Sequence, residues 1–335
     1  MRAMAIVRCG ALEEAALEAV EIDKPEPAAG QILLKVLACG VCHTELDQIE
    51  GRLRPGRLPV VPGHQIVGEV VEAGSGADRF AVGQRVGVTW LRSACMQCRY
   101  CDSGRENLCD AAQWTGHDAD GGYAEMTTAD ERFAYAIPEA FDDAEAAPLL
   151  CAGVIGYRAL RLAGIEEGHV VGLFGFGASA HIVIQVVRHL YPNNAVFVFT
   201  RGARHREHAK QLGAAWVGGP EDRPPAALDR AIDFTPVGET IKRALEVSAK
   251  GARLVVNAIR KRTPIPEMEY ARHLWHEREI TSVANVTAAD AEEFLPLAGR
   301  IPIRPKVTVY PLAEANEALK ELKAGGIDGA AVLKP

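Results

Sequence analysis

The sequence predicts an α/β protein that combines a mostly β domain with a second domain built on a doubly wound parallel sheet. The chain has 335 residues, which is more than one hydrophobic core usually holds, so two domains are expected. Short apolar segments separated by glycine and proline fill the first part of the chain. From about Cys151 onward, strand patterns alternate with helix patterns. This alternation indicates parallel strands joined by right-handed crossovers.

The expected elements follow from local patterns. In the first part, apolar stretches bounded by glycine or proline predict strands over residues 32–36, 65–73 and 84–88. In the second part, the predicted strands are 170–174, 195–199, 231–234, 253–257 and 280–284, and the predicted helices are 179–189, 205–212 and 238–248. Residues 218–225 predict a loop. A helix over 313–323 and a strand over 330–333 close the chain, and the pattern does not decide which domain they join.

Composition excludes several classes of protein. With 48% hydrophobic and 24% charged residues the chain is an ordinary globular protein, and its net charge of -7 argues against a broad nucleic-acid or anionic-membrane surface. The start shows no secretory signal, and polar residues interrupt the most apolar stretch, 170–187, so no membrane span is expected. We therefore expect a cytoplasmic protein. In a reducing compartment its eight cysteines indicate metal binding rather than disulfides.

Four of these cysteines form one compact cluster. Cys95, Cys98, Cys101 and Cys109 have the spacing C-x2-C-x2-C-x7-C, which places four thiolates where they can surround a tetrahedral Zn²⁺. All four positions are filled by protein, so such a zinc would be structural and closed to substrate. An iron–sulfur cluster, or incidental thiols, are the alternatives.

A second group of metal ligands is dispersed along the chain. Cys42 follows Gly40-Val41, His64 follows Pro62-Gly63, and Cys151 lies where the pattern changes. Singly, each is more often a buried structural residue than a ligand. Together they supply two thiolates and one imidazole, the kind of set that leaves a fourth position open on a catalytic zinc.

A glycine-rich turn predicts a nucleotide site. Gly175-Phe176-Gly177-Ala178-Ser179-Ala180 matches G-x-G-x-x-A, follows a predicted strand and opens a predicted helix. The glycines allow the backbone to approach a pyrophosphate at the positive end of the helix.

These motifs, in this order, resemble the zinc-containing alcohol dehydrogenases of the medium-chain dehydrogenase/reductase family over essentially the full chain. The matching pieces are Cys39-Gly40-Val41-Cys42-His43-Thr44, Pro62-Gly63-His64, the four-cysteine cluster, Cys151-Ala152-Gly153 and the Gly175 turn. The resemblance implies a GroES-like catalytic domain over 1–151 and 286–335, with a structural zinc lobe at about 90–112. It implies a Rossmann coenzyme domain over 152–285.

The resemblance also implies a mechanism and its residues. Cys42, His64 and Cys151 would hold the catalytic zinc, giving two Zn²⁺ per chain. Thr44 would accept the alcohol proton and His43 would face the cofactor phosphates. Trp90 would form a wall of the substrate pocket, and Ala258 and Ile259 would line the nicotinamide. The expected reaction is reversible hydride transfer between a primary or secondary alcohol and NAD or NADP, in a homodimer or homotetramer.

Several positions depart from the family pattern. Asp47 stands where several members carry a histidine at the outer end of the proton relay, and Glu45 and Gln65 replace the common Asp and Glu near the zinc. Thr200-Arg201 follows the second coenzyme-domain strand, where an acid would select NAD. NAD and NADP therefore both remain open. An arginine common near the C-terminus is Ala330 here.

Two further readings compete with a simple alcohol dehydrogenase. A polyol, aryl-alcohol or formaldehyde-type dehydrogenase would use the same scaffold, because a fold does not choose its substrate. A non-catalytic protein that binds zinc and nucleotide is the more distant alternative. The joint presence of Cys42, His64 and Cys151 argues against it, because a protein without catalysis has no need of all three.

Overall fold

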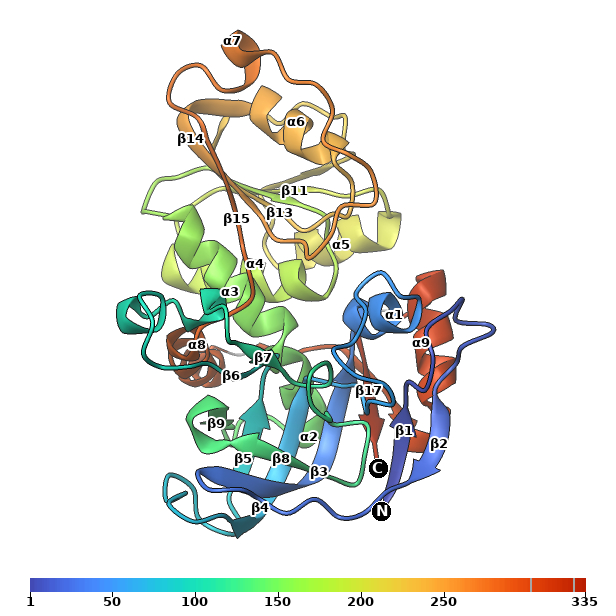
Figure 1. Cartoon of the computed structure of the whole chain (residues 1–335). Coiled ribbons are helices and arrows are strands. Elements are labelled where there is room, and N and C mark those ends of the chain that lie inside the picture. The colour runs from blue at the N-terminus through green and yellow to red at the C-terminus, as the bar shows by residue number, and fades with distance from the viewer. Residues whose placement is uncertain (302, 328) are drawn as a thin grey trace. The chain divides into compact units, whose positions relative to one another are not determined.

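The computed structural model describes residues 1–301, 303–327 and 329–335. The chain divides into two compact units (Figure 1). Unit 1 contains Met1–Cys151 and Asn285–Pro335, and unit 2 contains Ala152–Ala284.

Unit 1 is built on a mostly antiparallel sheet whose central strand is β3 (Gln31–Val41). The strand order is β16-β17-β3-β4-β5-β9, and β8 also pairs with β3. Apolar residues of β3 are buried on both faces, which explains why its pattern is a nearly continuous apolar run. The other strands are β4 (Ile66–Ala73), β5 (Arg85–Val88), β8 (Met126–Asp130), β9 (Ala134–Ala136), β16 (Val307–Pro311) and β17 (Ala330–Lys334).

The C-terminal segment belongs to unit 1. Strand β17 pairs antiparallel with β3, where Leu333 lies opposite Cys39. Helix α9 (Ala315–Ala324) precedes β17, begins two residues later than the predicted helix and ends at Gly325, which has a φ of 72°. The end of the chain therefore supports the strand that leads directly into Cys42 and helix α1.

Smaller elements complete unit 1. Two strand pairs stand apart from the main sheet: β1 (Arg2–Ala5) with β2 (Glu18–Glu21), and β6 (Leu91–Ser93) with β7 (Gln113–Trp114). The helices are α1 (His43–Ile49), α2 (Asp143–Ala146), α8 (Ala288–Arg300) and the short η1 (Cys101–Ser103), η2 (Glu106–Leu108), η3 (Glu131–Phe133), η4 (Ala147–Leu150) and η5 (Leu312–Glu314). The sequence patterns did not predict α1, α2 or α8.

Unit 2 is a parallel sheet with the order β12-β11-β10-β13-β14-β15 among the described residues. The strands are β10 (Val171–Phe174), β11 (Val196–Phe199), β12 (Trp216–Gly218), β13 (Leu228–Asp233), β14 (Ser248–Val256) and β15 (Glu279–Ser282). The helices are α3 (Ala152–Ala163), α4 (Ala178–Leu190), α5 (Ala203–Gln211), α6 (Glu239–Glu246) and α7 (Tyr270–His273). The strand order reverses direction between β10 and β13, which makes this the topological switch point of a doubly wound fold. The predicted fold class is confirmed.

Packing explains why the second half was the easier half to predict. Strands β10 and β11 are wholly buried, and the rings of Phe174 and Phe199 stack with centroids 4.2 Å apart. The run Asp143–Ala163 is long and apolar enough to cross a membrane, but 67% of its apolar window is buried inside the protein. It consists of α2, η4 and α3 in succession, which indicates core helices rather than one continuous span.

Candidate active site

Three separate segments of unit 1 bring their predicted metal ligands together. Cys42 is the N-cap of α1, His64 lies just before β4, and Cys151 follows η4. Their ligand atoms all lie within 4.8 Å of one another, and His64 Nε2 is 3.3 Å from Cys151 Sγ. The donor set of two sulfurs and one nitrogen fits a tetrahedral zinc with one position left for substrate.

Glu45 supports this ligand set from behind. Its Oε1 is 2.8 Å from His64 Nδ1, and its Oε2 accepts a hydrogen bond from the Cys42 backbone N–H at 2.7 Å. Glu45 is fully buried and stands three residues after the N-cap, the position of a capping-box carboxylate. A carboxylate on Nδ1 leaves Nε2 to face the two thiols.

Gln65, unlike Glu45, lies against Gly40 of β3. Its side chain packs against β3, since a Cβ built on Gly40 would lie 2.7 Å from Gln65 Cδ. The glycine at position 40 therefore makes room for the glutamine, and Glu45 is the carboxylate that contacts the ligand histidine.

The pKa values of the three ligands are shifted in different directions. Burial by itself would lower the pKa of His64, but Glu45 and Cys42 raise this pKa to about 10. The hydrogen bond with Cys151 holds the pKa of Cys42 well below its usual value, and the same bond together with burial raises the pKa of Cys151 well above it. Burial raises the pKa of Glu45, and attraction to His64 opposes that rise. These shifts favour the deprotonated form of Cys42 and the protonated forms of Cys151 and His64, so a cation that binds here competes with protons.

The four-cysteine cluster lies in the lobe between β6 and β7. Its four sulfurs are within 4.8 Å of one another, with 3.6 Å between Cys98 and Cys101 and 3.9 Å between Cys95 and Cys101. Cys109 Sγ also accepts a hydrogen bond from the Cys95 backbone N–H. The cysteines pack against a small apolar cluster that contains Leu91 and Phe133. Four sulfur donors fit a closed tetrahedral zinc.

An aromatic wall lies beside the three-ligand site. Trp90 stands edge-on to His64 with ring centroids 4.7 Å apart, and it contacts Trp114 at 6.2 Å and His117 at 5.8 Å. Gln48 on α1 donates to the carbonyl of Gly116 at 2.7 Å and is 3.2 Å from His117 Nδ1. Of this wall, the sequence identified only Trp90.

The three predicted relay residues occupy helix α1. The buried Thr44 hydroxyl is 3.6 Å from Cys42 Sγ, so it stands at the ligand set. Asp47, one turn further, is buried and accepts a hydrogen bond from Arg52 Nε at 2.5 Å. Arg52 also contacts Glu50. His43 is the first residue of the helix and is exposed.

The glycine turn of unit 2 has the form of a phosphate cradle. Gly175 has a φ of 84° and follows β10, and Gly177 is the N-cap of α4, whose first turn includes Ala178 and Ser179. A Cβ on Gly177 would meet nothing within 4 Å, so its backbone is open to a ligand. Phe176 is buried between the two glycines.

The other predicted cofactor residues lie at the same carboxyl edge of the sheet. Thr200 and Arg201 follow β11, and Ala258 and Ile259 follow β14, one residue after Asn257. Thr200 is buried, and its carbonyl accepts a hydrogen bond from Arg206 Nε at 2.9 Å. The position after β11 therefore offers a hydroxyl and a guanidinium rather than a carboxylate.

Comparison with known proteins places this site in a family. Residues 28–139 match the family described as "Alcohol dehydrogenase GroES-like domain". The chain is 46% identical over 338 residues to a probable alcohol dehydrogenase, AdhA, of Mycobacterium tuberculosis, covering 99% of this chain and 97% of the relative. The chain belongs to the zinc-containing medium-chain alcohol dehydrogenases.

Solved structures agree with this membership. A cobalt- and zinc-bound thermostable alcohol dehydrogenase from Pyrobaculum aerophilum superposes with a TM-score of 0.89 at 27% identity, covering 100% of this chain and 99% of that one. A zinc-binding dehydrogenase from Sinorhizobium meliloti, bound to NADP, gives 0.89 at 25% identity, with coverage of 100% and 99%. The predicted activity class, an NAD(P)-dependent zinc alcohol dehydrogenase that acts on small alcohols or aldehydes, is confirmed.

For this alcohol dehydrogenase, sequence reasoning missed the residues that act through contacts between distant segments. Trp114, His117 and Gln48 meet Trp90 only in the folded chain. Glu45 was noted as a departure, and its contact with His64 could not be read from the spacing of 19 residues. A signal for Glu45 existed in the capping-box spacing Cys42-x-x-Glu45.

Proposed function

We propose that unit 1 is the catalytic domain and unit 2 the coenzyme domain of a dehydrogenase that oxidises small primary alcohols, aromatic ones in particular, or reduces the corresponding aldehydes. The single observation that carries this proposal is the three-ligand set of Cys42, His64 and Cys151. A set with two thiols and one imidazole leaves a position for an alcohol oxygen, and its sulfurs and nitrogen are already gathered by the protein fold.

The reaction needs an alkoxide, because hydride leaves an alkoxide far more readily than a neutral alcohol. A bound zinc would lower the pKa of a coordinated oxygen to about 7, which favours the anion by on the order of 12 kcal/mol. Cys42, His64 and Cys151 would hold this ion. Glu45 orients His64 and keeps its Nε2 turned toward the metal position.

Thr44 is the proposed acceptor of the alcohol proton. Its hydroxyl is buried next to Cys42 Sγ, within the first turn of α1. A hydroxyl can accept a proton on one side and donate its own on the other. Asp47 is the proposed next group, and its pairing with Arg52 gives this carboxylate a fixed orientation. His43, exposed at the start of α1, is proposed to face the cofactor phosphates.

The aromatic wall supports the choice of substrate. Trp90, Trp114 and His117 present ring surfaces beside His64. Flat aromatic alcohols would gain from stacking on such rings, at about 0.5–1.5 kcal/mol for each good pair. A polyol substrate would need several polar partners, and the wall offers mainly rings.

The proposed cofactor is NAD or NADP, held by Gly175, Phe176, Gly177, Ala178 and Ser179 around the pyrophosphate. Ala258 and Ile259 are proposed to line the nicotinamide. Thr200 can bond a ribose hydroxyl, and Arg201 can pair with a 2′-phosphate. No carboxylate at Thr200-Arg201 repels that phosphate, so we expect NADP to be accepted as well as NAD.

The proposed assembly is a homodimer or homotetramer in the cytoplasm. Strand β15 ends the sheet of unit 2, and among the described residues it pairs with β14 alone, so its outer edge is a sheet edge. Exposed apolar side chains occur on and near this strand, at Ile280, Trp275 and Tyr270. A sheet edge with such side chains supports association with a second copy.

The test is benzyl alcohol oxidation with NAD and with NADP, in the protein as purified, after removal of metal by a chelator, and after zinc is returned. The proposal expects turnover that disappears with the metal and returns with zinc. If the zinc-loaded protein turns over neither benzyl alcohol nor ethanol nor the matching aldehydes, the result would contradict the proposal and favour a non-catalytic protein that binds zinc and nucleotide.

A further inference from the structure

Unit 2 contains a buried ion pair that belongs to none of the residue sets described above. Asp233 is the last residue of β13 and is fully buried. Its Oδ2 lies 2.5 Å from the ammonium of Lys261, a residue of the loop that follows β14. The Lys261 side chain is only 14% exposed. A buried lysine–carboxylate pair is uncommon enough to require an explanation.

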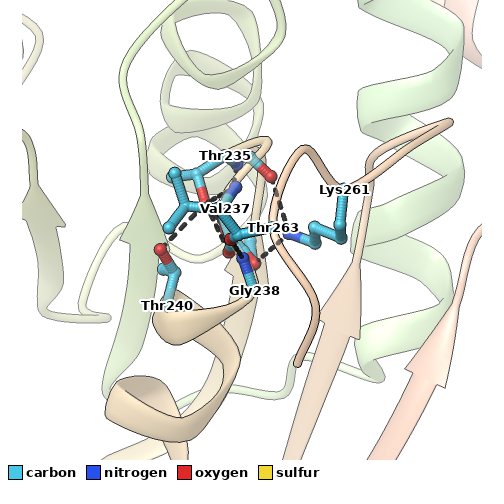
Figure 2. Close-up of polar contacts among 7 residues, drawn as sticks. Thr235, Val237, Gly238, Thr240, Lys261 and Thr263 are labelled. Atoms are coloured by element: carbon cyan, nitrogen blue, oxygen red, sulfur yellow. Dashed lines mark hydrogen bonds and ion pairs between the residues drawn. The ribbon is translucent and has the colours of Figure 1, made fainter. Parts of the chain in front are cut away.

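The ammonium of Lys261 makes a second bond. It donates to the backbone carbonyl of Thr235 at 2.6 Å, and Figure 2 shows the lysine reaching from its own loop to that carbonyl. The lysine therefore joins the loop after β14 to the turn after β13 through both a side chain and the main chain.

Other hydrogen bonds join the same two loops. The backbone N–H of Gly238 donates to Thr263 Oγ1 at 2.9 Å, and the backbone N–H of Arg262 donates to the carbonyl of Pro236 at 2.6 Å. A Cβ on Gly238 would collide with the Pro264 carbonyl, so only glycine allows this approach. The two loops are thus fastened at consecutive positions, 261, 262 and 263.

The turn after β13 also contains hydrogen bonds of its own. Thr235 donates from its hydroxyl to Asp233 Oδ1 at 2.8 Å and from its backbone N–H to the same oxygen at 2.9 Å. The Thr235 hydroxyl also lies 2.9 Å from that of Thr240 in α6. Figure 2 marks this contact with a dashed line. Asp233 is therefore held on one oxygen by Thr235 and on the other by Lys261.

This network lies at the topological switch point of the sheet. Strand β13 pairs with β10, and Thr235 packs against the glycine turn, since a Cβ on Gly175 would lie 3.1 Å from Thr235 Cγ2. The loop that contains Lys261 also contains Ala258 and Ile259, which lie three and two residues before the lysine. Both loops border the place where doubly wound folds bind dinucleotides.

We propose that Lys261, with Asp233, is a positioning residue for the dinucleotide: it fastens the loop after β14 to the turn after β13 and so fixes the backbone on both sides of the switch point. The proposal rests on the cofactor site of the proposed function. Lys261 is not placed in contact with the reacting atoms, and its effect is expected on cofactor affinity rather than on the chemical step.

Two physical arguments favour a positioning role over a purely stabilising one. Apolar residues of similar volume would stabilise a buried site at least as well as an ion pair, so the pair is better explained by the geometry that it specifies. The ammonium also neutralises Asp233 at an edge that must receive an anionic pyrophosphate. Burial raises the pKa of Asp233, and Lys261 opposes that rise.

The decisive variant removes both charges together. Lys261→Met alone would leave a buried carboxylate without a partner and endanger folding. Asp233→Asn with Lys261→Met keeps the side-chain volumes and the acceptor for Thr235, and it removes only the fastening bonds of the ammonium. The matched control is Arg253→Gln with Glu279→Gln, because that ion pair, at 2.8 Å, joins β14 to β15 on the surface of the same sheet.

The measurement is the dissociation constant of NADH and NADPH by fluorescence titration, with cofactor KM, kcat, zinc content and thermal unfolding in the same preparations. We expect the double variant to bind cofactor about fivefold to tenfold more weakly, the effect of losing one or two hydrogen bonds. Its kcat at saturating cofactor and its zinc content should stay those of the native enzyme. The single variant Lys261→Arg, which keeps a cation beside Asp233, should retain most of the native affinity for NADH and NADPH.

Three results would overturn the proposal: native cofactor affinity in the double variant, a fall in kcat with unchanged cofactor KM, or an equal loss of affinity in the surface control pair. A native protein that binds neither NADH nor NADPH would overturn the proposed cofactor site itself. The two failures are therefore distinguishable in one series of titrations.

Discussion

The two metal-binding groups of unit 1 use the same ligand chemistry with opposite architecture. Cys95, Cys98, Cys101 and Cys109 come from one segment of 15 residues, and they supply all four donors of a tetrahedron. Cys42, His64 and Cys151 come from three segments, the first and last of which are 109 residues apart, and they supply only three. The first group organises a local lobe, whereas the second depends on the whole unit.

The difference teaches how a fold makes a metal site reactive. A local loop can satisfy zinc completely, and a fully satisfied zinc has no position for substrate. Three donors held by separate elements leave a position open, and the buried Glu45 keeps the imidazole in place. The aromatic wall of Trp90 then borders the open group, while the lobe cysteines pack against Leu91 and Phe133.

The largest effect expected within this comparison is on proton transfer. Thr44→Val should lower kcat for benzyl alcohol by about 10²–10⁴-fold, because the hydroxyl proposed to accept the alcohol proton is lost. Zinc content should stay at two per chain. Thr308→Val, an exposed change on β16, is the control. Native turnover by Thr44→Val would remove this residue from the mechanism.

The second expected effect is the pH dependence of zinc uptake by the three-ligand group. The pKa of His64 is raised to about 10 and that of Cys151 is raised well above its usual value, so both groups hold protons at neutral pH. Zinc must displace these protons. Its apparent affinity should therefore rise with pH by roughly tenfold to a hundredfold per unit between pH 6.5 and 8.5.

Chelator competition at each pH measures this affinity, with Cys101→Ser used so that only the three-ligand group binds zinc. An affinity independent of pH would show that the ligands are already deprotonated.

A smaller effect is expected from the carboxylate behind the ligands. Glu45→Gln keeps the shape and removes the charge that holds His64, so zinc affinity at this group should fall by about 10- to 100-fold. The lobe zinc should be unaffected. The control is Glu72→Gln on the surface, whose partner is the exposed Lys24. If Glu45→Gln binds zinc as tightly as the native enzyme does, Glu45 only caps helix α1 and does not contribute to zinc affinity.

Much of unit 2 was predictable from sequence because its signals are local. The buried run Val171–Phe174, the glycine turn and helix α4 follow one another within 20 residues. Buried parallel strands have continuous apolar runs. The structure shifts the predicted limits of β10 and β11 by only one residue, whereas β13 begins three residues and β14 five residues before the predicted strands. The last strand was ambiguous, because Ala330–Lys334 has the same apolar pattern whether it joins β3 or the other sheet.

The site was predictable as a set of ligands but not as an environment. Cysteine and histidine are recognisable wherever they occur, and their order along the chain matches the family. The contacts of Glu45 with His64, of Trp90 with His117 and of Lys261 with Asp233 join segments that only the fold brings together. No local spacing encodes them. Asp47 illustrates the point, because its partner Arg52 becomes evident only in the structure.

The central claim is that one metal group is catalytic and the other structural, and zinc stoichiometry in two cysteine variants tests it most directly. The native enzyme should hold two zincs. Cys151→Ser should hold one, show no alcohol oxidation and unfold near the native temperature. Cys101→Ser should also hold one, but it should unfold at a lower temperature and keep measurable turnover at low temperature. Two zincs and full turnover in Cys151→Ser, or the same loss of activity and stability in both variants, would contradict the account.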